Sequence, residues 1–113
     1  MNIERGDILL IGFDPTKGSE IQKTRPAVVV TNNVANKFSK LLTVVPITSQ
    51  KIDTIRVFES LIKVAEGLKK QSKAVISQMR AIDRSRIQKK IGKISKADLK
   101  SIDKTIKIHL GLK

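Results

Sequence analysis

The chain has no cysteine, no tryptophan and no tyrosine, and its 113 residues include one histidine. Without cysteine there are no disulfides, no thiolate nucleophile and no cysteine-ligated zinc site. Because phenylalanine occurs only three times, recognition of single-stranded nucleic acid by an extended platform of stacked bases is disfavoured. The lone histidine excludes two-histidine ribonuclease chemistry and histidine-based metal sites.

Carboxylates are also few, and none is grouped at a convincing metal-binding spacing. They stand singly at Asp7, Asp14, Glu20, Asp53 and Glu59. A metal-dependent nuclease needs clustered carboxylates, so this class is disfavoured, and we expect neither a metal nor another cofactor. A phosphate-binding glycine loop is missing as well, because Gly18 stands alone and opens no helix.

No apolar stretch approaches the roughly 20 residues that a membrane-spanning helix needs. The first six residues lack the apolar core of a secretory signal. We therefore expect a cytoplasmic protein that makes no contact with a membrane. The length, with 40% hydrophobic residues, fits one globular domain over residues 1–113.

The chain is strongly basic. Lysine and arginine together number 23 against 10 acidic residues, a formal net charge of +13. This favours a polyanionic partner, nucleic acid first, because each neutralised phosphate releases condensed counterions. A merely solvated basic surface and an acidic protein partner remain as alternatives.

Short runs rich in Val, Ile and Leu, each bounded by turn residues, predict strands in the first half of the chain. These runs are Asp7–Phe13, Ala27–Thr31 and Leu41–Thr48. Their near-continuous apolarity indicates burial on both faces, by closure into a small barrel or by a dimer partner. A fourth strand is expected over Arg56–Val64 and a fifth over Lys73–Ile82.

The alternating pattern of the fifth run predicts one shared strand face, made of Ala74, Ile76, Gln78, Arg80 and Ile82. The basic stretch Asp83–Ile94 predicts a turn and a last short strand. Asn32 and Asn33 predict the start of a short helix that ends near Phe38.

The clearest helix lies at the C-terminal end. Ser95 and Asp98 form a variant of the capping box, and Gly111 marks the stop. An apolar stripe is formed by Leu99, Ile102, Ile106 and Leu110, with Lys96, Lys100, Lys104 and Lys107 facing water. His109, near the helix end, favours the helix dipole, which indicates a structural role. The sequence as a whole predicts a mainly β, α+β fold.

Polar residues gather where the first strands begin and end. The loop Pro15–Glu20 follows the first strand, Arg25 precedes Pro26, and Thr48-Ser49 ends the third strand. Pro26 suits the start of a strand and biases Arg25 toward an extended backbone. From position alone, a surface arginine and ordinary strand-end hydroxyls remain the simpler interpretation.

A set of motifs runs in order along the chain. They are Gly6-Asp7-Ile8, Pro15-Thr16-Lys17-Gly18-Ser19-Glu20, Thr24-Arg25-Pro26-Ala27-Val28-Val29, Asn32-Asn33, Ile47-Thr48-Ser49, Ser77-Gln78-Met79-Arg80-Ala81-Ile82-Asp83 and Lys90-Ile91-Gly92-Lys93-Ile94. Together with the closing helix they cover almost the whole chain. In order and spacing they resemble the MazF/PemK family of toxin endoribonucleases from type II toxin–antitoxin modules.

This resemblance implies a compact SH3-like β-barrel with a C-terminal α-helix and short helices, assembled as a homodimer. It also implies sequence-specific, metal-independent cleavage of single-stranded RNA, chiefly mRNA, which inhibits translation and growth. In the family scheme a ribose 2′-OH attacks the adjacent phosphate and leaves a 2′,3′-cyclic phosphate and a 5′-OH end. The expected partner is an acidic, MazE-like antitoxin with a disordered segment that folds along the groove and dimer face.

The family's catalytic arginine falls on Arg25 and its catalytic threonine on Thr48. The resemblance implies RNA contacts at Lys17, Ser19, Glu20, Ser49, Gln78 and Arg80. A guanidinium suits this chemistry because it forks two hydrogen bonds onto phosphate oxygens and stays charged. An arginine is a poor general base because its guanidinium stays protonated, so the base stays unassigned.

Further positive charge in the groove is expected from Lys23 and Lys51, beside Lys17 and Arg80. The run Arg84, Arg86, Lys89 and Lys90 either extends the groove or forms a solvated face, and the second interpretation is favoured. The recognised base sequence cannot be carried over, because the region of residues 50–70 varies within the family.

Two other classes of function stay open. One is a non-catalytic barrel toxin that inhibits a protein target such as DNA gyrase, since a barrel alone does not fix function. The other is an RNA-binding module without catalysis, which would bind RNA in a strongly salt-dependent way.

Overall fold

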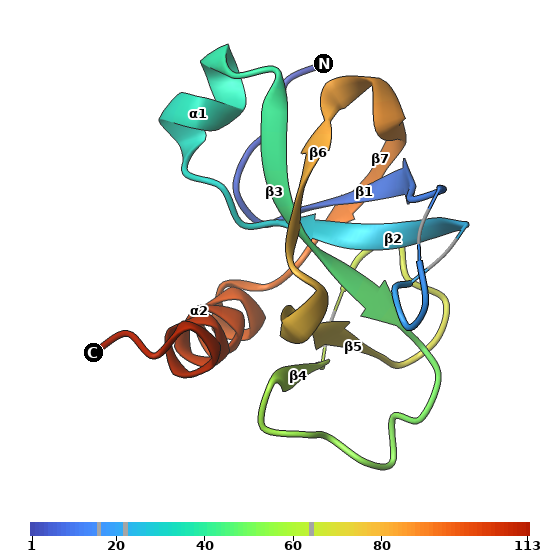
Figure 1. The fold of residues 1–113 in the computed structure, drawn as a ribbon, viewed down its shortest axis with the longest axis vertical. Helices are drawn as coiled ribbons and strands as arrows, with labels where there is room; N and C mark the ends of the chain where they lie inside the picture. The colour runs from blue at the N-terminus through green and yellow to red at the C-terminus, as the bar shows by residue number, and fades with distance from the viewer. Residues whose placement is uncertain (16, 22, 64) are drawn as a thin grey trace.

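The computed structural model describes residues 1–15, 17–21, 23–63 and 65–113, and it shows a curled antiparallel sheet with two α-helices (Figure 1). The strands are β1 (Asp7–Gly12), β2 (Thr24–Val29), β3 (Leu41–Thr48), β4 (Glu59–Ile62), β5 (Ser72–Val75), β6 (Arg80–Asp83) and β7 (Ile87–Lys93). The helices are α1 (Asn33–Phe38) and α2 (Lys96–Leu110), and two 3-10 turns are η1 (Ile76–Gln78) and η2 (Arg84–Arg86). The predicted mainly β fold with a C-terminal helix is confirmed. Two predicted positions, Thr16 of the polar loop and Val64 at the end of the fourth strand, lie outside the described residues.

The long strand β3 organises the sheet, whose order is β4-β5-β3-β2-β1-β7. Along one edge β3 pairs with β2, where Ala27 lies opposite Pro46. Along the other edge its first half pairs with β6 and its end pairs with β5, where Thr48 lies opposite Lys73. The pairing with β2 therefore ends at Pro46, and the last two residues of β3 pair with β5.

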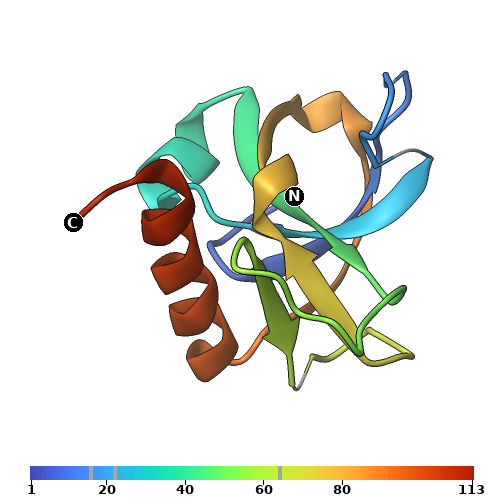
Figure 2. The same cartoon turned by 60° about the horizontal axis from the view of Figure 1, so that its bottom comes forward.

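The first three strands are buried on both faces, because successive side chains enter two different apolar clusters. The first cluster consists of Ile3, Leu9, Ile11, Phe13, Ala27, Val29, Leu42, Val44 and Ile82. The second consists of Ile8, Val28, Val45, Ile47, Ile62, Ala74, Ile76, Ile94 and Ile102. Ile102 belongs to α2, which lies beside β4 (Figure 2). The predicted burial on both faces is confirmed, and a single chain supplies both cores.

The predicted continuous strand over Lys73–Ile82 is wrong. The chain breaks into β5, the turn η1 and β6. Alternation of side chains holds only in an extended backbone, so the prediction that Ala74, Ile76, Gln78, Arg80 and Ile82 share one strand face is wrong too. The turn redirects the chain so that β5 and β6 pair with different halves of β3.

Other element boundaries also differ from prediction, and β1 and β2 end at Gly12 and Val29, one and two residues earlier than predicted. β4 begins at Glu59 and not at Arg56, because residues 56–59 form a turn in which the Glu59 N–H donates to the Arg56 carbonyl at 2.9 Å. β2 begins at Thr24 and includes Pro26, earlier than predicted. β7, the last strand, runs for 7 residues after the turn η2 and is longer than expected.

Both helices begin as predicted. The Asn32 side chain accepts the Ala35 N–H at 2.9 Å, and Ser95 Oγ accepts the Asp98 N–H at 3.1 Å. Gly111 ends α2 in the left-handed conformation, with φ of 70°. The apolar stripe of α2 is shorter than predicted, because Leu110 is 51% exposed. Among the described residues, no helix combines the length and apolarity needed to cross a membrane.

The connection between β4 and β5 contacts the backbone of β7, and its residues 65–71 are called the β4–β5 loop. Gly67 has φ of 89°, and a Cβ there would overlap the Ile91 carbonyl. A Cβ on Gly92 would overlap the Glu66 carbonyl in the same way. Two glycines therefore allow a direct contact between the two backbones.

The substitution Gly67→Ala should lower the free energy of unfolding by about 3 kcal/mol, because the new methyl group forces the loop away from β7. Urea denaturation measures this loss. Gly18→Ala is the matched control, since Gly18 also has positive φ but no atom lies within 4 Å of the added Cβ. That control should cost only about 1 kcal/mol. Equal losses for the two variants would contradict the close contact.

Candidate functional site

Arg25 and Thr48 lie on neighbouring strands at the same end of the sheet. The β2–β3 ladder ends where Ala27 lies opposite Pro46, and Arg25 and Thr48 each lie two residues beyond that pair, toward the same end of the sheet. Both residues line the same two hollows, of about 380 and 290 Å³. Arg25 is exposed and Thr48 is half-buried. The structure thus brings together the two residues that the sequence singled out as catalytic.

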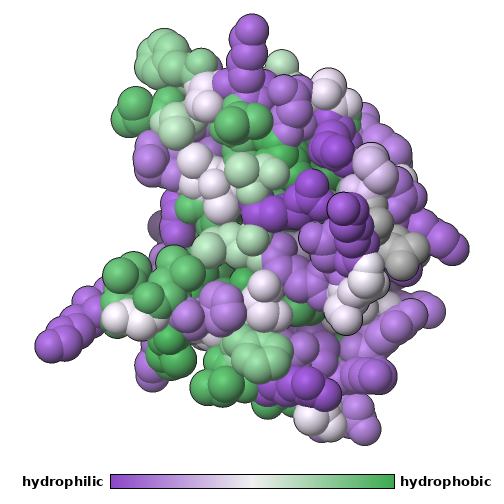
Figure 3. Space-filling view, viewed as in Figure 1, coloured by the Kyte–Doolittle hydropathy of each residue, from purple (hydrophilic) through white to green (hydrophobic). Residues whose placement is uncertain are grey.

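These two hollows are the middle part of a longer groove, called the site groove. A hollow of about 550 Å³, lined by Gln78 and Arg80, shares residues 19–21 with the 380 Å³ hollow. Beyond the 290 Å³ hollow, which Ser49 also lines, a further hollow of about 320 Å³ shares Leu68, Lys69 and Lys70 with it. In space-filling view, hydrophilic side chains cover much of the side where the β1–β2 connection lies, and apolar ones gather over the end of α2 (Figure 3).

The Thr48 hydroxyl is oriented by its own turn. Its Oγ accepts the Gln50 N–H at 3.1 Å, a bond that closes a small turn at the end of β3. A hydroxyl that accepts one hydrogen bond keeps its proton for donation. Thr48 can therefore donate to an anion seated beside Arg25.

Gln78 holds the polar loop between β1 and β2. Its side-chain oxygen accepts the Ile21 N–H at 2.6 Å, and its amide group donates to the Ser19 carbonyl at 3.2 Å. Within the loop, the Glu20 carboxylate accepts the Lys17 N–H at 2.5 Å. Gln78 was predicted to contact RNA, and here both ends of its amide group hold the loop.

The predicted positive charge of the groove is only partly in place. Lys23 lines the 380 Å³ hollow, and Arg80 lines the 550 Å³ hollow with its guanidinium 5.7 Å from the Phe13 ring centre. Lys17 is exposed but lines none of the four hollows of the groove. Lys69 and Lys70 line two of them, and beyond their charge no sequence pattern marks these two residues.

Most of the basic run after β6 contacts the protein itself. Arg86 donates to the carbonyls of Gly12 and Asp14, at 3.1 and 2.7 Å. Arg84 donates to the Ser39 carbonyl at 2.8 Å, and Lys90 pairs with the buried Asp7 carboxylate at 3.1 Å. Neither an extended groove nor a simply solvated face therefore describes this run.

The loop that follows Thr48 is anchored by a buried ammonium group, which sequence reasoning missed. Lys73 Nζ donates to the carbonyls of Lys51 and Thr54, both at 3.0 Å, and to the Glu59 carboxylate at 2.8 Å. The side chains of Lys73 and Glu59 are 5% and 9% exposed. A lone lysine among the apolar residues of β5 was the available signal, because such a residue needs a buried partner.

The charge of Glu59 is stabilised at this position. Burial alone would raise the pKa of this carboxyl group, but the hydrogen bonds from Lys73 and from the Arg56 N–H outweigh it. The pKa of Glu59 therefore lies below its ordinary value of 4.5.

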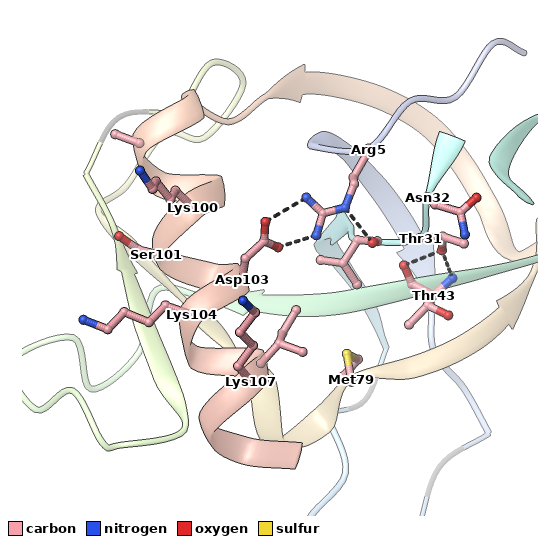
Figure 4. Close-up of a pocket in the computed structure, with 13 residues that line it drawn as sticks. Arg5, Thr31, Asn32, Thr43, Met79, Lys100, Ser101, Asp103, Lys104 and Lys107 are labelled. Atoms are coloured by element: carbon pink, nitrogen blue, oxygen red, sulfur yellow. Dashed lines mark hydrogen bonds and ion pairs between the residues drawn. The ribbon is translucent and has the colours of Figure 1, made fainter. Parts of the chain in front are cut away.

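A larger hollow, of about 1140 Å³, lies elsewhere, between α2 and the start of β3 (Figure 4). Arg5 crosses it with a two-pronged contact to Asp103, in which Nη1 donates at 3.0 Å, while its Nε donates to the Val30 carbonyl at 2.9 Å. Size alone does not mark the site, because neither Arg25 nor Thr48 lines this hollow.

His109 and the scattered carboxylates do not form a second site. The His109 ring lies 6.4 Å from the Phe58 ring, and it lines none of the hollows described above. Among the described residues, no three His, Asp or Glu side chains gather as a metal site would require.

Comparison with known proteins matches the chain to a family over residues 4–110, described as the PemK-like, MazF-like toxin of type II toxin–antitoxin systems. The chain belongs to this family. It is 38% identical to endoribonuclease MazF9 of Mycobacterium tuberculosis, over 97% of this chain and 98% of that protein.

Solved structures of MazF toxins share the fold of this family member. The crystal structure of MazF from Deinococcus radiodurans has a TM-score of 0.86 at 22% identity, covering 99% of each chain. A mycobacterial endoribonuclease in complex with its cognate antitoxin has a TM-score of 0.82 at 14% identity, covering 98% of this chain and 97% of that one. The expected MazF-like barrel is confirmed.

The Glu59→Gln substitution should weaken the dependence of stability on acid pH. Because the folded pKa of Glu59 lies below 4.5, its contribution to stability is complete above about pH 4.5 and is lost as the pH falls through the folded pKa. At neutral pH the variant should lose about 3 kcal/mol, since Lys73 stays buried without its counter-ion. Urea denaturation at several pH values between about 3 and 7 measures both effects.

Asp53→Asn is the control for this series, because Asp53 lies in the loop before β4 that Lys73 anchors but is itself exposed. It should keep both the stability and the acid dependence of the unaltered chain. An unchanged acid dependence in Glu59→Gln would contradict the role given to the Lys73–Glu59 pair.

Proposed function

We propose that this toxin is a sequence-specific, metal-independent endoribonuclease that cleaves single-stranded RNA, chiefly mRNA, in the cytoplasm and so stops translation and growth. The observation that carries the proposal is the pairing of Arg25 with Thr48 at the centre of a groove lined by lysines. The name of the 38% identical relative, an endoribonuclease, supports the same activity.

In the proposed reaction the nucleophile is a ribose 2′-OH group of the RNA substrate itself. The ribose 2′-oxygen forms a bond to the adjacent phosphorus, the bond from phosphorus to the 5′-oxygen breaks, and a 2′,3′-cyclic phosphate and a 5′-OH end remain. The proton of the 2′-OH passes to a base that we leave unassigned, and the departing 5′-oxygen takes up a proton.

Arg25 and Thr48 act on the charge that develops in this reaction. The guanidinium forks two hydrogen bonds onto the non-bridging phosphate oxygens, and the Thr48 hydroxyl donates a third. We also assign to Arg25 the transfer of a proton to the departing 5′-oxygen. Holding the 2′-OH in line with that oxygen supplies further acceleration.

The loop over residues 17–21 closes one side of the groove. Ser19 and Glu20 line both the 550 Å³ and the 380 Å³ hollow. Gln78 holds the backbone of this loop through its hydrogen bonds to Ser19 and Ile21. We assign RNA contacts to Ser19, Glu20, Ser49 and Arg80, and a positioning role to Gln78. Lys17 and Lys51 add charge near the groove without lining its hollows.

The active toxin is proposed to be a homodimer. Apolar residues at the end of α2 support a partner there, since Ile108, Leu110 and Leu112 are 54, 51 and 59% exposed. Sedimentation of the purified protein measures this, and a monomer at micromolar concentration would contradict it.

The proposed regulator is an acidic, MazE-like antitoxin whose disordered segment folds along the site groove and excludes RNA. Relatives solved with an antitoxin support such a partner. Cleavage that continues with the antitoxin at saturating concentration would contradict exclusion.

Purified protein incubated with a long single-stranded RNA should cut it at a short recurring sequence and leave 2′,3′-cyclic phosphate and 5′-OH ends. End mapping by sequencing identifies both the sequence and the chemistry. Activity should persist in excess EDTA, and its loss there would indicate a metal requirement. Intact RNA together with inhibited DNA gyrase would favour the non-catalytic toxin.

The Arg25→Ala variant should lower kcat by about 10²–10³-fold, because the fork onto the phosphate is lost. Thr48→Val should lower it by about 10–100-fold, the size expected for one hydrogen bond to a charged group. Single-turnover cleavage of an end-labelled RNA measures both effects. Thr48→Ser is the matched control and should retain most activity, since it keeps the hydroxyl. Near-normal cleavage by both Arg25→Ala and Thr48→Val would refute the assignment.

A further inference from the structure

The β4–β5 loop places two lysines beside the Arg25–Thr48 pair. Lys69 and Lys70 line the 290 Å³ hollow together with Arg25 and Thr48, and both are exposed. Within the described part of the chain, neither lysine is paired with a carboxylate. Two adjacent cations without a counter-ion, next to a phosphate-binding pair, form an attractive position for a second anion.

The residues that line this hollow suit one nucleotide unit of an RNA chain. Pro26, Ile47 and Leu68 line the same hollow and provide apolar surface there. A hollow lined by both cations and apolar side chains matches a chain that alternates phosphates with sugars and bases. It also continues into the hollow lined by Lys63 and Gln71.

The lysines are presented by a loop whose position the backbone fixes. Gly67 and Gly92 bring the loop against β7, and Ala65 forms a β-bridge with Ile94. Leu68 packs on the second core cluster. At the other end of the loop, Ser72 Oγ donates to the Lys70 carbonyl at 2.9 Å. This placement does not depend on the charge of Lys69 or Lys70, so both can be neutralised while the bonds that hold the loop stay in place.

We propose that Lys69 and Lys70 form a second phosphate subsite, which holds a phosphate of the RNA next to the scissile one. The proposal rests on the proposed endoribonuclease function and adds a specific contact to it. RNA is favoured over an acidic antitoxin segment as occupant, because the subsite shares its hollow with Arg25 and Thr48, on which the scissile phosphate is placed. The subsite acts on binding and on the register of the RNA, with no part in bond breaking.

The test compares the double variant Lys69→Gln/Lys70→Gln with Lys96→Gln/Lys113→Gln. The control removes the same charge from exposed positions that line none of the groove hollows. The probe is a short RNA that contains the mapped cleavage sequence, with deoxyribose at the cleaved nucleotide so that it binds without reacting. In a series of these RNAs, each flanking phosphate in turn is replaced by an uncharged methylphosphonate.

We expect the Lys69/Lys70 double variant to bind the unmodified RNA roughly tenfold more weakly, with a log–log salt slope reduced by about 0.7 for each phosphate that is no longer neutralised. For the unaltered toxin, a methylphosphonate at one flanking position should weaken RNA binding by a similar factor. The affinity of the double variant should not change when the phosphate at that position is replaced. On cleavable RNA the double variant should show a raised KM with kcat nearly unchanged. The control pair should change the KM by less than about twofold, since exposed charges far from the ligand are screened.

Three contrary results can be told apart. If unaltered toxin cleaves RNA and the double variant keeps the same KM and the same sensitivity at every flanking phosphate, the subsite is refuted while the proposed function stands. A double variant that cleaves normally but escapes inhibition by an acidic antitoxin would assign the lysines to that partner and also refute the subsite. A lack of RNA binding and cleavage by unaltered toxin would instead overturn the proposed function itself.

Discussion

The buried ammonium group of Lys73 determines the shape of this end of the molecule. Lys73 lies opposite Thr48 in the β3–β5 ladder, and its three hydrogen bonds reach two backbone carbonyls of the next loop and the Glu59 carboxylate. An ammonium group has three donors, and here all three are used, so its burial is compensated. The same contacts fix where the chain goes after Thr48. The strand end that presents this hydroxyl group is therefore held by the β3–β5 ladder, and the loop after it is held by the Lys73–Glu59 ion pair.

Around the groove, the residues that hold the walls in position differ from the residues that supply charge to a ligand. Groups that position the walls are themselves satisfied within the protein, as the amide group of Gln78 and the ammonium group of Lys73 are. Groups that would meet a ligand, such as Lys69 and Lys70, are exposed at the rim. The net charge of +13 favours the binding of a polyanion but does not specify where the polyanion binds. The positions of these few exposed cations determine where it would lie.

The sequence predicted those parts of the fold that depend on local pattern. Helix caps at Asn32 and Ser95 follow from short-range hydrogen bonds, and two-sided burial of the first strands follows from their apolar composition. Alternation failed over Lys73–Ile82, because a 3-10 turn interrupts the strand where it must pair with two parts of β3. Such a turn depends on the pairing of β5 and β6 with β3, and the alternation of apolar residues in the sequence does not reveal it. Arg25 and Thr48 were found through ordered motifs, while the placement of Lys69 and Lys70 depends on contacts between segments that no local pattern encodes. The lone lysine of β5 indicated a buried partner, but only the contact between segments identifies that partner as Glu59.

The contact between Gly67 and Gly92 has a consequence for how this toxin can diverge. Because two backbones meet there, the placement of the adjoining loop is independent of the side chains at its tip. Substitutions at positions 69–71 can then change affinity for different substrates in small steps, at nearly constant stability of the fold. A change at either glycine would instead affect folding itself. The chain thus keeps the residues that can vary gradually apart from the two that cannot, which makes this loop a natural place for related toxins to acquire new preferences.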